Sequence, residues 1–439
     1  MLMMLALAGL GLLVALGFAL RLAVPALGRL LLPVSLIGGA IGLAAGPHGL
    51  GLVPRDVLAQ WTSLPAPLIA IVFACLFLGA PVPSLAAVGR TAGPLVRFSV
   101  LNAVGQYVVG FALTWLVLGP LFGTPAIFGC LIEVGFSGGH GTASAMAPVF
   151  TDLGFPAGAV LGQMAATVGL VVGVVGGVWL IQWGARRGHT HVLPRGALAV
   201  SDSSGLLPAG ARPSIATATV SPVVIEPFTL HVAAIGLALL AGTALLEALR
   251  NVHPMFDAFP LFPLAMLGGM AVQSASVRLG IDGWFDRASF QRLSGLALDL
   301  LVTSAVASMR LDLFAQHLAP FVLLMVAAIV WCVASFVWLA PRLLPEDWFE
   351  QGLVVYGTQT GVAAVGLMLL RIADPEQQTT AARAFAARSV VIAPLLGGGL
   401  ITAAMPLLVT QFGLAPLLAA VTVVTAGAWF WPGRRAATR

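Results

Sequence analysis

Two glycine-rich segments interrupt apolar stretches of this sequence and carry its densest sets of polar groups. The first holds six candidate ligand-binding residues: Ser137, Gly138, Gly139, His140, Gly141 and Thr142. The second offers four more: Thr358, Gln359, Thr360 and Gly361. Glycines let the backbone approach a ligand, and free N–H groups at the start of a half-helix favour an anion. Free carbonyls at the opposite helix ends suit a cation. The alternative is that the glycines only permit tight helix packing and that the hydroxyls satisfy unwound backbone.

Two acidic residues lie within apolar runs. Glu133 precedes the first glycine segment by about one turn, and Asp299 lies in the run 296–304 together with Thr303. A charge at membrane depth costs about 2.5–3.5 kcal/mol on insertion scales, so such residues are functional candidates. We assign Glu133, Asp299 and Thr303 to cation binding, because an acid repels an anionic substrate. A water-filled vestibule around Glu133 and a buried arginine partner for Asp299 are the alternatives.

Two further polar residues allow two interpretations each. His140 either contacts a substrate or proton, or is a hydrogen-bonded core residue at a helix break. Arg371 follows the second glycine segment and either neutralises a carboxylate or anchors the chain at the membrane surface.

The elements that must hold these residues are membrane-spanning helices. The chain is 59% hydrophobic and 8% charged, with a mean hydropathy of +1.02. A soluble protein cannot cover its surface with so few polar groups, so the composition indicates an all-α polytopic membrane protein. Candidate spans lie at about 2–20, 30–46, 64–80, 97–118, 158–183, 228–248, 260–277, 293–309, 318–339 and 389–408, with an extra helix at 414–431.

The glycine segments cannot continue a lipid-facing helix, because its backbone must satisfy its own hydrogen bonds. We therefore predict re-entrant hairpins near 124–151 and 350–371. The expected order is a first repeat at 1–184, a linker at 185–226, a second repeat at 227–410, and a C-terminal helix with a basic tail at 411–439.

The repeats share a phrase and have opposite orientations. Pro33 followed by Gly38-Gly39 recurs as Pro263 followed by Gly268-Gly269. With five crossings per repeat and the N-terminus outside, all arginines except Arg55, Arg250 and Arg310 fall on the cytoplasmic side, together with the linker and the C-terminus. An odd number of crossings inverts the second repeat, which brings the two hairpin tips together near the midplane.

Several other classes of protein lack support in the sequence. The net charge of +5 comes from arginines at the ends of segments, and no basic, aromatic-interleaved stretch indicates nucleic-acid binding. The three cysteines lie in apolar runs without metal or disulfide spacing. No P-loop, metal cluster or hydrolytic triad is present, so we expect an ion gradient as the energy source and no cofactor besides the coupling ion.

The string Ser137-Gly138-Gly139-His140-Gly141-Thr142-Ala143, followed by Gly154-Phe155-Pro156 and the helix 165–171, resembles the sodium/glutamate symporter family. The resemblance implies a homodimeric carrier in the bacterial inner membrane that couples sodium to glutamate or a similar anionic amino acid. It also implies elevator-like movement, with substrate and sodium near the hairpin tips. The second tip, Gly357–Ala363, lacks the proline of glutamate carriers and adds Gln359.

We therefore expect a secondary active transporter that works by alternating access. One alternative is a sodium- or proton-coupled carrier of another carboxylate, of the citrate or malate type. A second is an intramembrane enzyme using Glu133, His140 and Asp299, whose spacing gives no sign of a nucleophile or metal. A third is a channel, although two closed hairpins suit occlusion better than a continuous pore.

Overall fold

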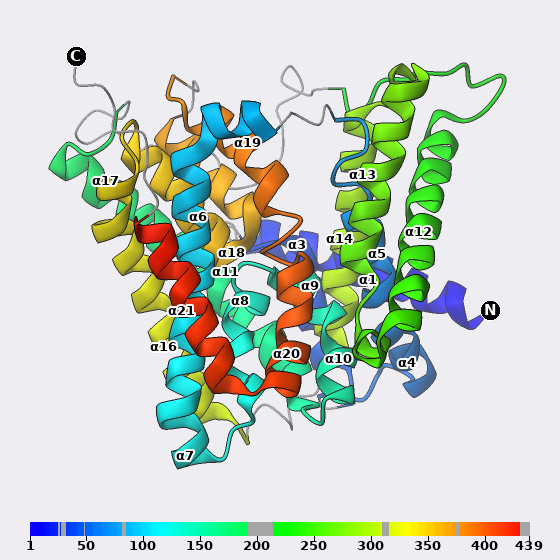
Figure 1. Cartoon of the computed structure of the whole chain (residues 1–439). Helices are drawn as coiled ribbons and strands as arrows, with labels where there is room; N and C mark the ends of the chain where they lie inside the picture. The colour runs from blue at the N-terminus through cyan, green and yellow to red at the C-terminus, as the bar shows by residue number, and fades with distance from the viewer. Residues whose placement is uncertain are drawn as a thin grey trace. The chain divides into compact units, whose positions relative to one another are not determined.

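The chain is helical and contains no strand in the part that the computed structural model describes (Figure 1). Seven helices in that part are long and apolar enough to cross a membrane: Leu2–Ala23, Arg55–Ala74, Ala92–Phe122, Ala157–Arg187, Pro227–Val252, Leu318–Leu343 and Trp348–Ala373. The predicted all-α character and polytopic class are therefore confirmed. The structure describes residues 1–24, 27, 32–47, 49–80, 85–191, 214–309, 316–374 and 378–430.

Two compact units make up the chain, and each takes one segment from either half. Unit 1 comprises Met1–Val82 and Ser201–Leu311, and unit 2 comprises Pro83–Val200 and Asp312–Arg439. Of the predicted linker 185–226, residues 192–213 lie outside the described residues. The same holds for 431–439 of the predicted C-terminal segment.

Unit 1 contains two sets of helices, one from each half of the chain. The set from the first half is α1 (Leu2–Ala23), α3 (Val34–Ala45), α4 (Arg55–Ser63) and α5 (Pro65–Ala74). The set from the second half is α12 (Pro227–Val252), η4 (Pro254–Ala258), α13 (Phe262–Leu279), η5 (Asp282–Trp284) and α14 (Arg287–Ala307).

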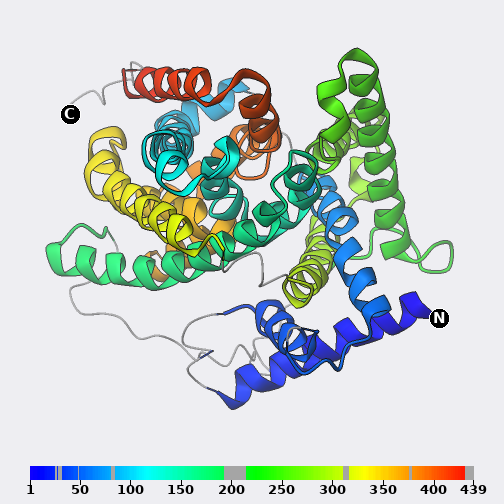
Figure 2. The ribbon, with the colours of Figure 1, turned by 90° about the horizontal axis from the view of Figure 1, so that it is seen from below.

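Close helix packing explains the first glycine of the repeated phrase. A Cβ on Gly38 of α3 would lie 2.6 Å from the Leu13 carbonyl oxygen of α1. A Cβ on Gly268 of α13 would overlap the Ala238 carbonyl oxygen of α12. Small residues let helix backbones approach in this way within membranes. In each half, the first glycine of the phrase therefore lets two helices pack closely, α3 on α1 and α13 on α12. Figures 1 and 2 show α12 and α13 side by side.

The second glycine of the phrase packs against the opposite half. A Cβ on Gly39 would lie 2.6 Å from Val306 Cβ on α14, and one on Gly269 would overlap the Ala74 carbonyl oxygen at the end of α5. Helix α3 thus packs on α14, and α13 packs on α5. Within unit 1, each copy of the phrase therefore packs its second glycine against a helix from the other half of the chain.

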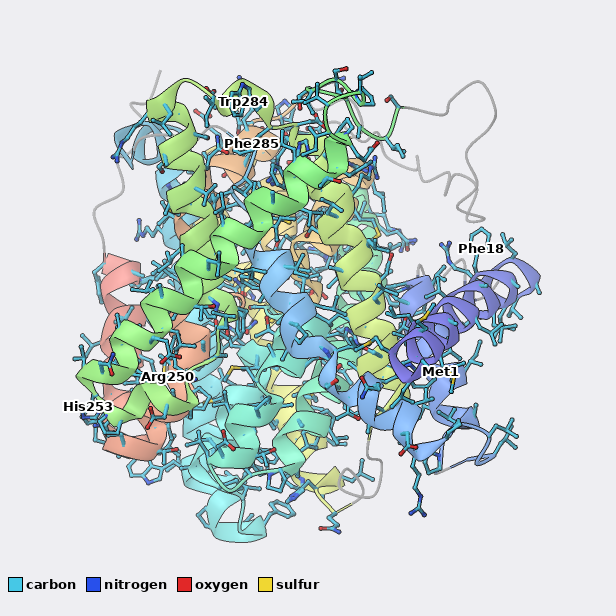
Figure 3. The ribbon with its side chains drawn as sticks, turned by 90° about the vertical axis from the view of Figure 1, so that its right-hand side faces the viewer. Met1, Phe18, Arg250, His253, Trp284 and Phe285 are labelled. Atoms are coloured by element: carbon cyan, nitrogen blue, oxygen red, sulfur yellow. The ribbon has the colours of Figure 1, made fainter. Side chains whose placement is uncertain are left out.

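Polar contacts around η5 connect the helices at one end of the α12–α13 pair. Thr219 Oγ1 donates to the Trp284 carbonyl oxygen (2.6 Å), and the His231 ring accepts from the Asp286 amide (2.8 Å). Asp286 also caps α14, since its carboxylate accepts from the Ser289 amide at 2.8 Å. Trp284 and Phe285 lie at this end, and Arg250 and His253 at the other (Figure 3).

Two helices of unit 2, one from each half of the chain, each widen into a π-helical turn near their C-terminal end. Helix α6 (Leu85–Leu113) continues into the π-helical turn η1 (Thr114–Leu118), and α16 (Leu318–Ala334) into the π-helical turn η6 (Ser335–Leu339). Each turn directly precedes a short helix with a proline at its start, Pro120 in α7 (Gly119–Phe122) and Pro341 in α17 (Ala340–Leu343). Proline lacks an N–H and clashes with the carbonyl four residues earlier, which accounts for the widened turn.

The rest of unit 2 surrounds a pair of long helices. Helix α11 (Ala157–Arg187) lies against α18 (Trp348–Ala373) along a row of glycines, where a Cβ on Gly173 would lie 2.7 Å from Thr360 Oγ1. Helices α19 (Ala381–Ile392) and α21 (Leu414–Phe430) both pack on α6 (Figure 1). The remaining elements are η2 (Ala126–Cys130), α8 (Leu131–Gly135), α9 (Gly139–Ala145), α10 (Ala147–Asp152) and α20 (Leu400–Phe412).

Candidate functional site

Helix α18 reverses direction at the second predicted glycine segment. Gly361 (φ −139°, ψ 36°) and Val362 (φ 62°, ψ 173°) leave the helical conformation. A Cβ on Gly357 would lie 2.7 Å from the Gly366 Cα, whereas a continuous helix would separate these residues by about 13.5 Å. Its two arms, 348–360 and 363–373, therefore pack against each other as a hairpin.

The first predicted segment also folds back on itself. The helix stops at Gly135 and resumes at Gly139, whose φ is +69°. The Phe128 and Phe155 rings, on either side of this segment, lie 5.9 Å apart. The chain therefore enters and leaves this segment at the same end of unit 2.

The tips of the two hairpins meet within unit 2. The Ser137 hydroxyl donates to the Gln359 side-chain oxygen. A Cβ on Gly139 would overlap Val362 Cγ1, so both its space and its positive φ require glycine there. Gln106 of α6 supports the junction, because its amide nitrogen donates to the Gln359 carbonyl oxygen at 2.7 Å.

A third break lies beside these tips. The predicted span 389–408 is wrong as a continuous helix, because residues 393–399 separate α19 from α20. Gly397 and Gly398 have positive φ values of +66° and +98°. Proline at 394 followed by three glycines at 397–399 cannot sustain a helix, and this pattern was visible in the sequence.

Glu133 connects the first hairpin to the third break. Its carboxylate accepts from the Gly397 amide at 2.6 Å and from the Tyr107 hydroxyl at 3.1 Å. The next amide, of Gly398, donates to Thr402 Oγ1 at 3.1 Å. Glu133, Tyr107 and Thr402 are all buried. The only acid of the first hairpin therefore lies among hydrogen-bond donors from α6 and the third break.

The remaining residues of the first segment face α11 or the tip itself. His140 Nε2 lies 3.0 Å from Thr167 Oγ1, and the His140 carbonyl accepts from Gln163 Nε2 at 3.2 Å. Gly138 lies at the tip and Gly141 in the first turn of α9. Thr142 is fully buried, and its hydroxyl has no hydrogen-bond partner among the described residues.

The threonines of the second segment bond to their own helix. Thr358 Oγ1 donates to the Val354 carbonyl (2.7 Å), and Thr360 Oγ1 donates to the Tyr356 carbonyl (2.8 Å). The side chain of Gln359 is therefore the one that reaches the other tip, while Gly361 opens the turn.

Asp299 and Thr303 lie on α14 of unit 1, whereas both tips belong to unit 2. Thr303 Oγ1 lies 2.9 Å from the Asp299 carbonyl and 3.2 Å from the Ser35 carbonyl of α3. The pair thus belongs to the contact between α14 and α3. Asp299 is exposed in unit 1.

Helix α6 carries a polar face that is absent from the residues predicted from sequence. Ser99, Asn102 and Gln106 are fully buried and recur at helical spacing. Trp331 Nε1 donates to the Asn102 carbonyl at 3.0 Å, and Asn102 Nδ2 donates to Ser335 Oγ at 2.7 Å. The spacing of these residues in an apolar run was the available signal.

A family model described as sodium/glutamate symporter matches residues 2–357, which is well over half of the chain. The chain belongs to this family. The predicted resemblance is thereby confirmed, and the protein is a multi-pass membrane transporter and not an enzyme. The family name describes sodium-coupled transport of glutamate. No curated protein and no solved structure matches the chain.

The sodium/glutamate symporter match includes Glu133 and the whole first tip and ends at Gly357. Thr358, Gln359, Thr360, Gly361 and the third break follow its last residue. In this symporter, unit 2 thus brings together one tip inside the matched region and two breaks beyond it.

Proposed function

We propose that this protein couples sodium entry to the uptake of L-glutamate by alternating access, and that glutamate binds where the two hairpin tips meet. The observation that carries the proposal is the hydrogen bond from Ser137 to Gln359. It joins two helix breaks, and broken helices at membrane depth are tolerated where protein encloses them or a water-filled cavity lies beside them.

The chemistry of the tips suits an amino acid. The Gly138 amide donates to the Glu133 carbonyl oxygen at 2.9 Å, but the amides in the first turn of α9, which begins at Gly139, have no acceptor within their helix and favour a carboxylate. The side-chain oxygens of Ser137 and Gln359 can accept from an ammonium group. Glutamate would take the place of the bond between the tips. Its binding would thereby be linked to the relative position of the two hairpins, which is the link that coupling requires.

The inverted repeat and the re-entrant placement of the hairpins belong to this proposal. Two observations support the repeat, namely the exchanged contacts of Gly39 and Gly269 and the matching π-helical turns before Pro120 and Pro341. Repeats of opposite orientation supply two similar conformations that open to opposite sides.

For the cation, the proposal keeps Glu133, Asp299 and Thr303 as sodium ligands, with sodium as the coupling ion and no other cofactor. Glu133 is supported by its burial beside Thr402 and the unwound residues 397–399. Each net charge moved across the membrane contributes about 2.3 kcal/mol per 100 mV. Uptake of one glutamate with two sodium ions would therefore be electrogenic.

We place the protein in the bacterial inner membrane, with the N-terminus outside and the C-terminus and linker cytoplasmic. The support comes from unit 1, where Arg278, Arg287 and Arg292 flank the Trp284 end of the α12–α13 pair and Arg250 lies at the other end. We further propose a homodimer, as expected from the family resemblance.

Reconstituted proteoliposomes test the proposal. An inward sodium gradient should drive accumulation of labelled L-glutamate, a potential negative inside should increase it, and dissipating the sodium gradient should abolish it. Unlabelled citrate and malate serve as competitors. Uptake of glutamate that ignores the sodium gradient would contradict the proposal, and sodium-driven uptake of citrate or malate in place of glutamate would replace it by the hydroxycarboxylate alternative.

A further inference from the structure

A buried arginine of unit 2 has a free donor group. Arg388 on α19 is 3% exposed, and its Nε donates to Ser99 Oγ of α6 at 2.8 Å. The guanidinium carbon lies 5.4 Å from the centre of the Phe385 ring. Its Nη2 nitrogen is buried and has no hydrogen-bond partner among the described residues.

No acidic residue in the described ranges forms an ion pair with Arg388. The ion pairs found there join His191 to Asp347 and Arg250 to Glu247. Burying a charge without a partner costs free energy. An ionisable group inside the membrane that still has an unused hydrogen-bond donor therefore points to a ligand. Arginine offers a planar fork of donors that matches a carboxylate.

The position of Arg388 links it to the hairpin tips. Ser99, Asn102 and Gln106 lie on one face of α6, with Arg388 bonded to Ser99 and the Gln359 carbonyl bonded to Gln106. The seven helical steps from Ser99 to Gln106 span about 10.5 Å. Between them, the buried Asn102 Oδ1 has no hydrogen-bond partner in the described part of the chain.

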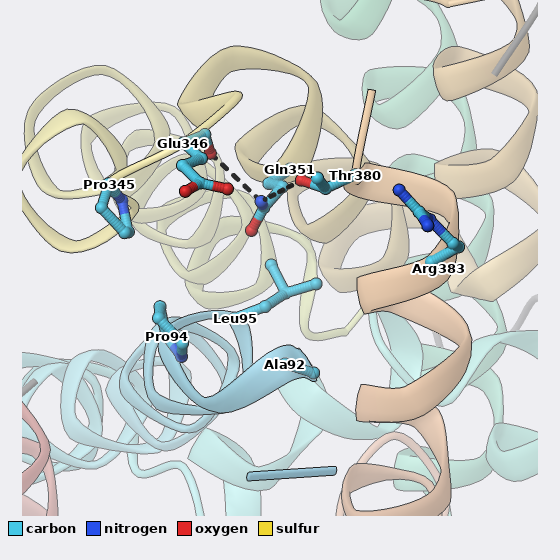
Figure 4. A pocket seen from close by; sticks show the side chains of 8 residues that line it. All are labelled: Ala92, Pro94, Leu95, Pro345, Glu346, Gln351, Thr380 and Arg383. Carbon is cyan, nitrogen blue, oxygen red and sulfur yellow. Dashed lines mark hydrogen bonds between the residues drawn. The ribbon is translucent and has the colours of Figure 1, made fainter. Parts of the chain in front are cut away.

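A pocket of about 310 Å³ is lined by residues that precede Ser99 on α6 and Arg388 on α19 (Figure 4). Leu95 of α6 and Arg383 of α19 line it, together with Gln351, whose amide donates to Thr380 Oγ1 at 3.0 Å. Leu95 precedes Ser99 by four residues, and Arg383 precedes Arg388 by five. Along α6, the contacts therefore follow in the order pocket (Leu95), Arg388 (Ser99) and second tip (Gln106).

We propose that Arg388 binds the side-chain carboxylate of the transported amino acid, which reaches it from this pocket, while the amino and α-carboxylate groups lie toward the tips. The inference rests on the proposed function and assigns its selectivity. Arg388 makes the site prefer an acidic amino acid over its neutral amide, because an amide cannot neutralise the guanidinium. Arg371, the arginine considered in the sequence analysis, is exposed on α18.

The test compares variants in the reconstituted full-length protein, with L-glutamate uptake and its inhibition by L-glutamine as readouts. In Arg388→Gln, the KM for glutamate should rise about 10- to 100-fold, as expected for losing a charged hydrogen-bonded partner. Inhibition by glutamine should change less than threefold, since glutamine carries no charge at that end. Arg278→Gln, which changes an exposed arginine in the last turn of α13 in unit 1, is the matched control and should behave as wild type.

A second variant covers the case in which Arg388→Gln does not fold. Arg388→Lys keeps the charge but loses the fork, and its KM for glutamate should rise about tenfold with glutamine inhibition unchanged. Equal losses for glutamate and glutamine in folded protein, or an unchanged glutamate KM in Arg388→Gln, would overturn the inference while leaving sodium-driven uptake in place. Wild-type protein without sodium-driven glutamate uptake would instead overturn the proposed function. Stabilisation of wild type by added L-glutamate, lost in Arg388→Gln, would then still support the role of Arg388, and its absence would refute it.

Discussion

The Ser137 hydroxyl donates a hydrogen bond to the Gln359 side-chain oxygen, which joins two helix breaks that are 222 residues apart in the chain. Both partners are buried in unit 2, and Gln106 donates to the carbonyl of the same glutamine. A small solute that enters between the tips must replace this bond with bonds of its own.

Ser137→Ala and Gln359→Ala should therefore each raise the KM for glutamate, by about tenfold for a lost hydrogen bond to a charged ligand. Because both side chains contact the same substrate, the double variant should lose less than the product of the two single effects. Uptake kinetics in proteoliposomes measure this. Thr151→Ala on the exposed surface of α10 is the control, and strict additivity would argue against a shared ligand.

Gly139 should not tolerate a side chain. Gly139→Ala places a methyl group against Val362 at a positive φ, which should lower the free energy of unfolding by about 1–3 kcal/mol and reduce uptake. Val362→Gly in the same chain should restore part of the loss, because it removes the clash and the strained conformation of Val362. Thermal unfolding in detergent measures both. Gly236→Ala on α12, where a Cβ meets nothing within 4 Å, should change stability by about 1 kcal/mol or less. A fully tolerated Gly139→Ala would contradict the contact between the tips.

The repeated phrase should be a scaffold feature in both halves. Gly38→Val and Gly268→Val should each destabilise the protein by about 1–3 kcal/mol, since the side chain must push apart two helix backbones. The melting temperature in detergent reports this, and Gly11→Ala on α1, with open space at its Cβ, is the control. If only one of the two valine variants were destabilised, the two phrases would not be structurally equivalent.

The sodium dependence of uptake distinguishes the proposed role of Glu133 from that of its neighbour Tyr107. Glu133→Gln should raise the sodium concentration for half-maximal uptake at least about tenfold, because it removes the only charge at that position. Tyr107→Phe leaves the charge and removes one donor to it, so it should cost about 1–3 kcal/mol of stability with little change in sodium dependence. The opposite pattern would make Glu133 a residue that only holds the third break.

Low pH should reduce the stability of the protein by protonating Asp374, which follows α18. Burial raises the pKa of this carboxyl, but hydrogen bonds from the Thr379 hydroxyl (2.6 Å), the Thr379 amide (2.9 Å) and the Gln378 amide (2.8 Å) together lower it below its usual range. A lowered folded-state pKa gives stability that is present above the unfolded-state pKa of about 3.9 and is lost as the pH falls through the folded-state pKa.

Melting temperatures of wild type and Asp374→Asn between pH 3 and 7 test this point. The stability advantage of wild type should be full near pH 7 and should shrink below about pH 4. An advantage that stays constant over this range would show that the ionised carboxylate contributes nothing.

The sequence predicted the two hairpin segments because a cluster such as 135–142 cannot remain a helix in lipid. It missed the break at 393–399 because the surrounding apolar residues satisfied the criterion for an ordinary span. It also missed the face of α6 formed by Ser99, Asn102 and Gln106, since each is a single polar residue among apolar ones. The cation-binding role of Asp299 and Thr303 stays a prediction, and their place on α14 of unit 1 could not be predicted because a linear sequence does not show which helices share a unit.

A density map of the protein with sodium and L-glutamate bound tests the central claim most directly. We expect glutamate density between Ser137 and Gln359, with the hydrogen bond between these residues replaced by bonds to the ligand. Glutamate bound elsewhere, with the Ser137–Gln359 bond intact, would contradict the account.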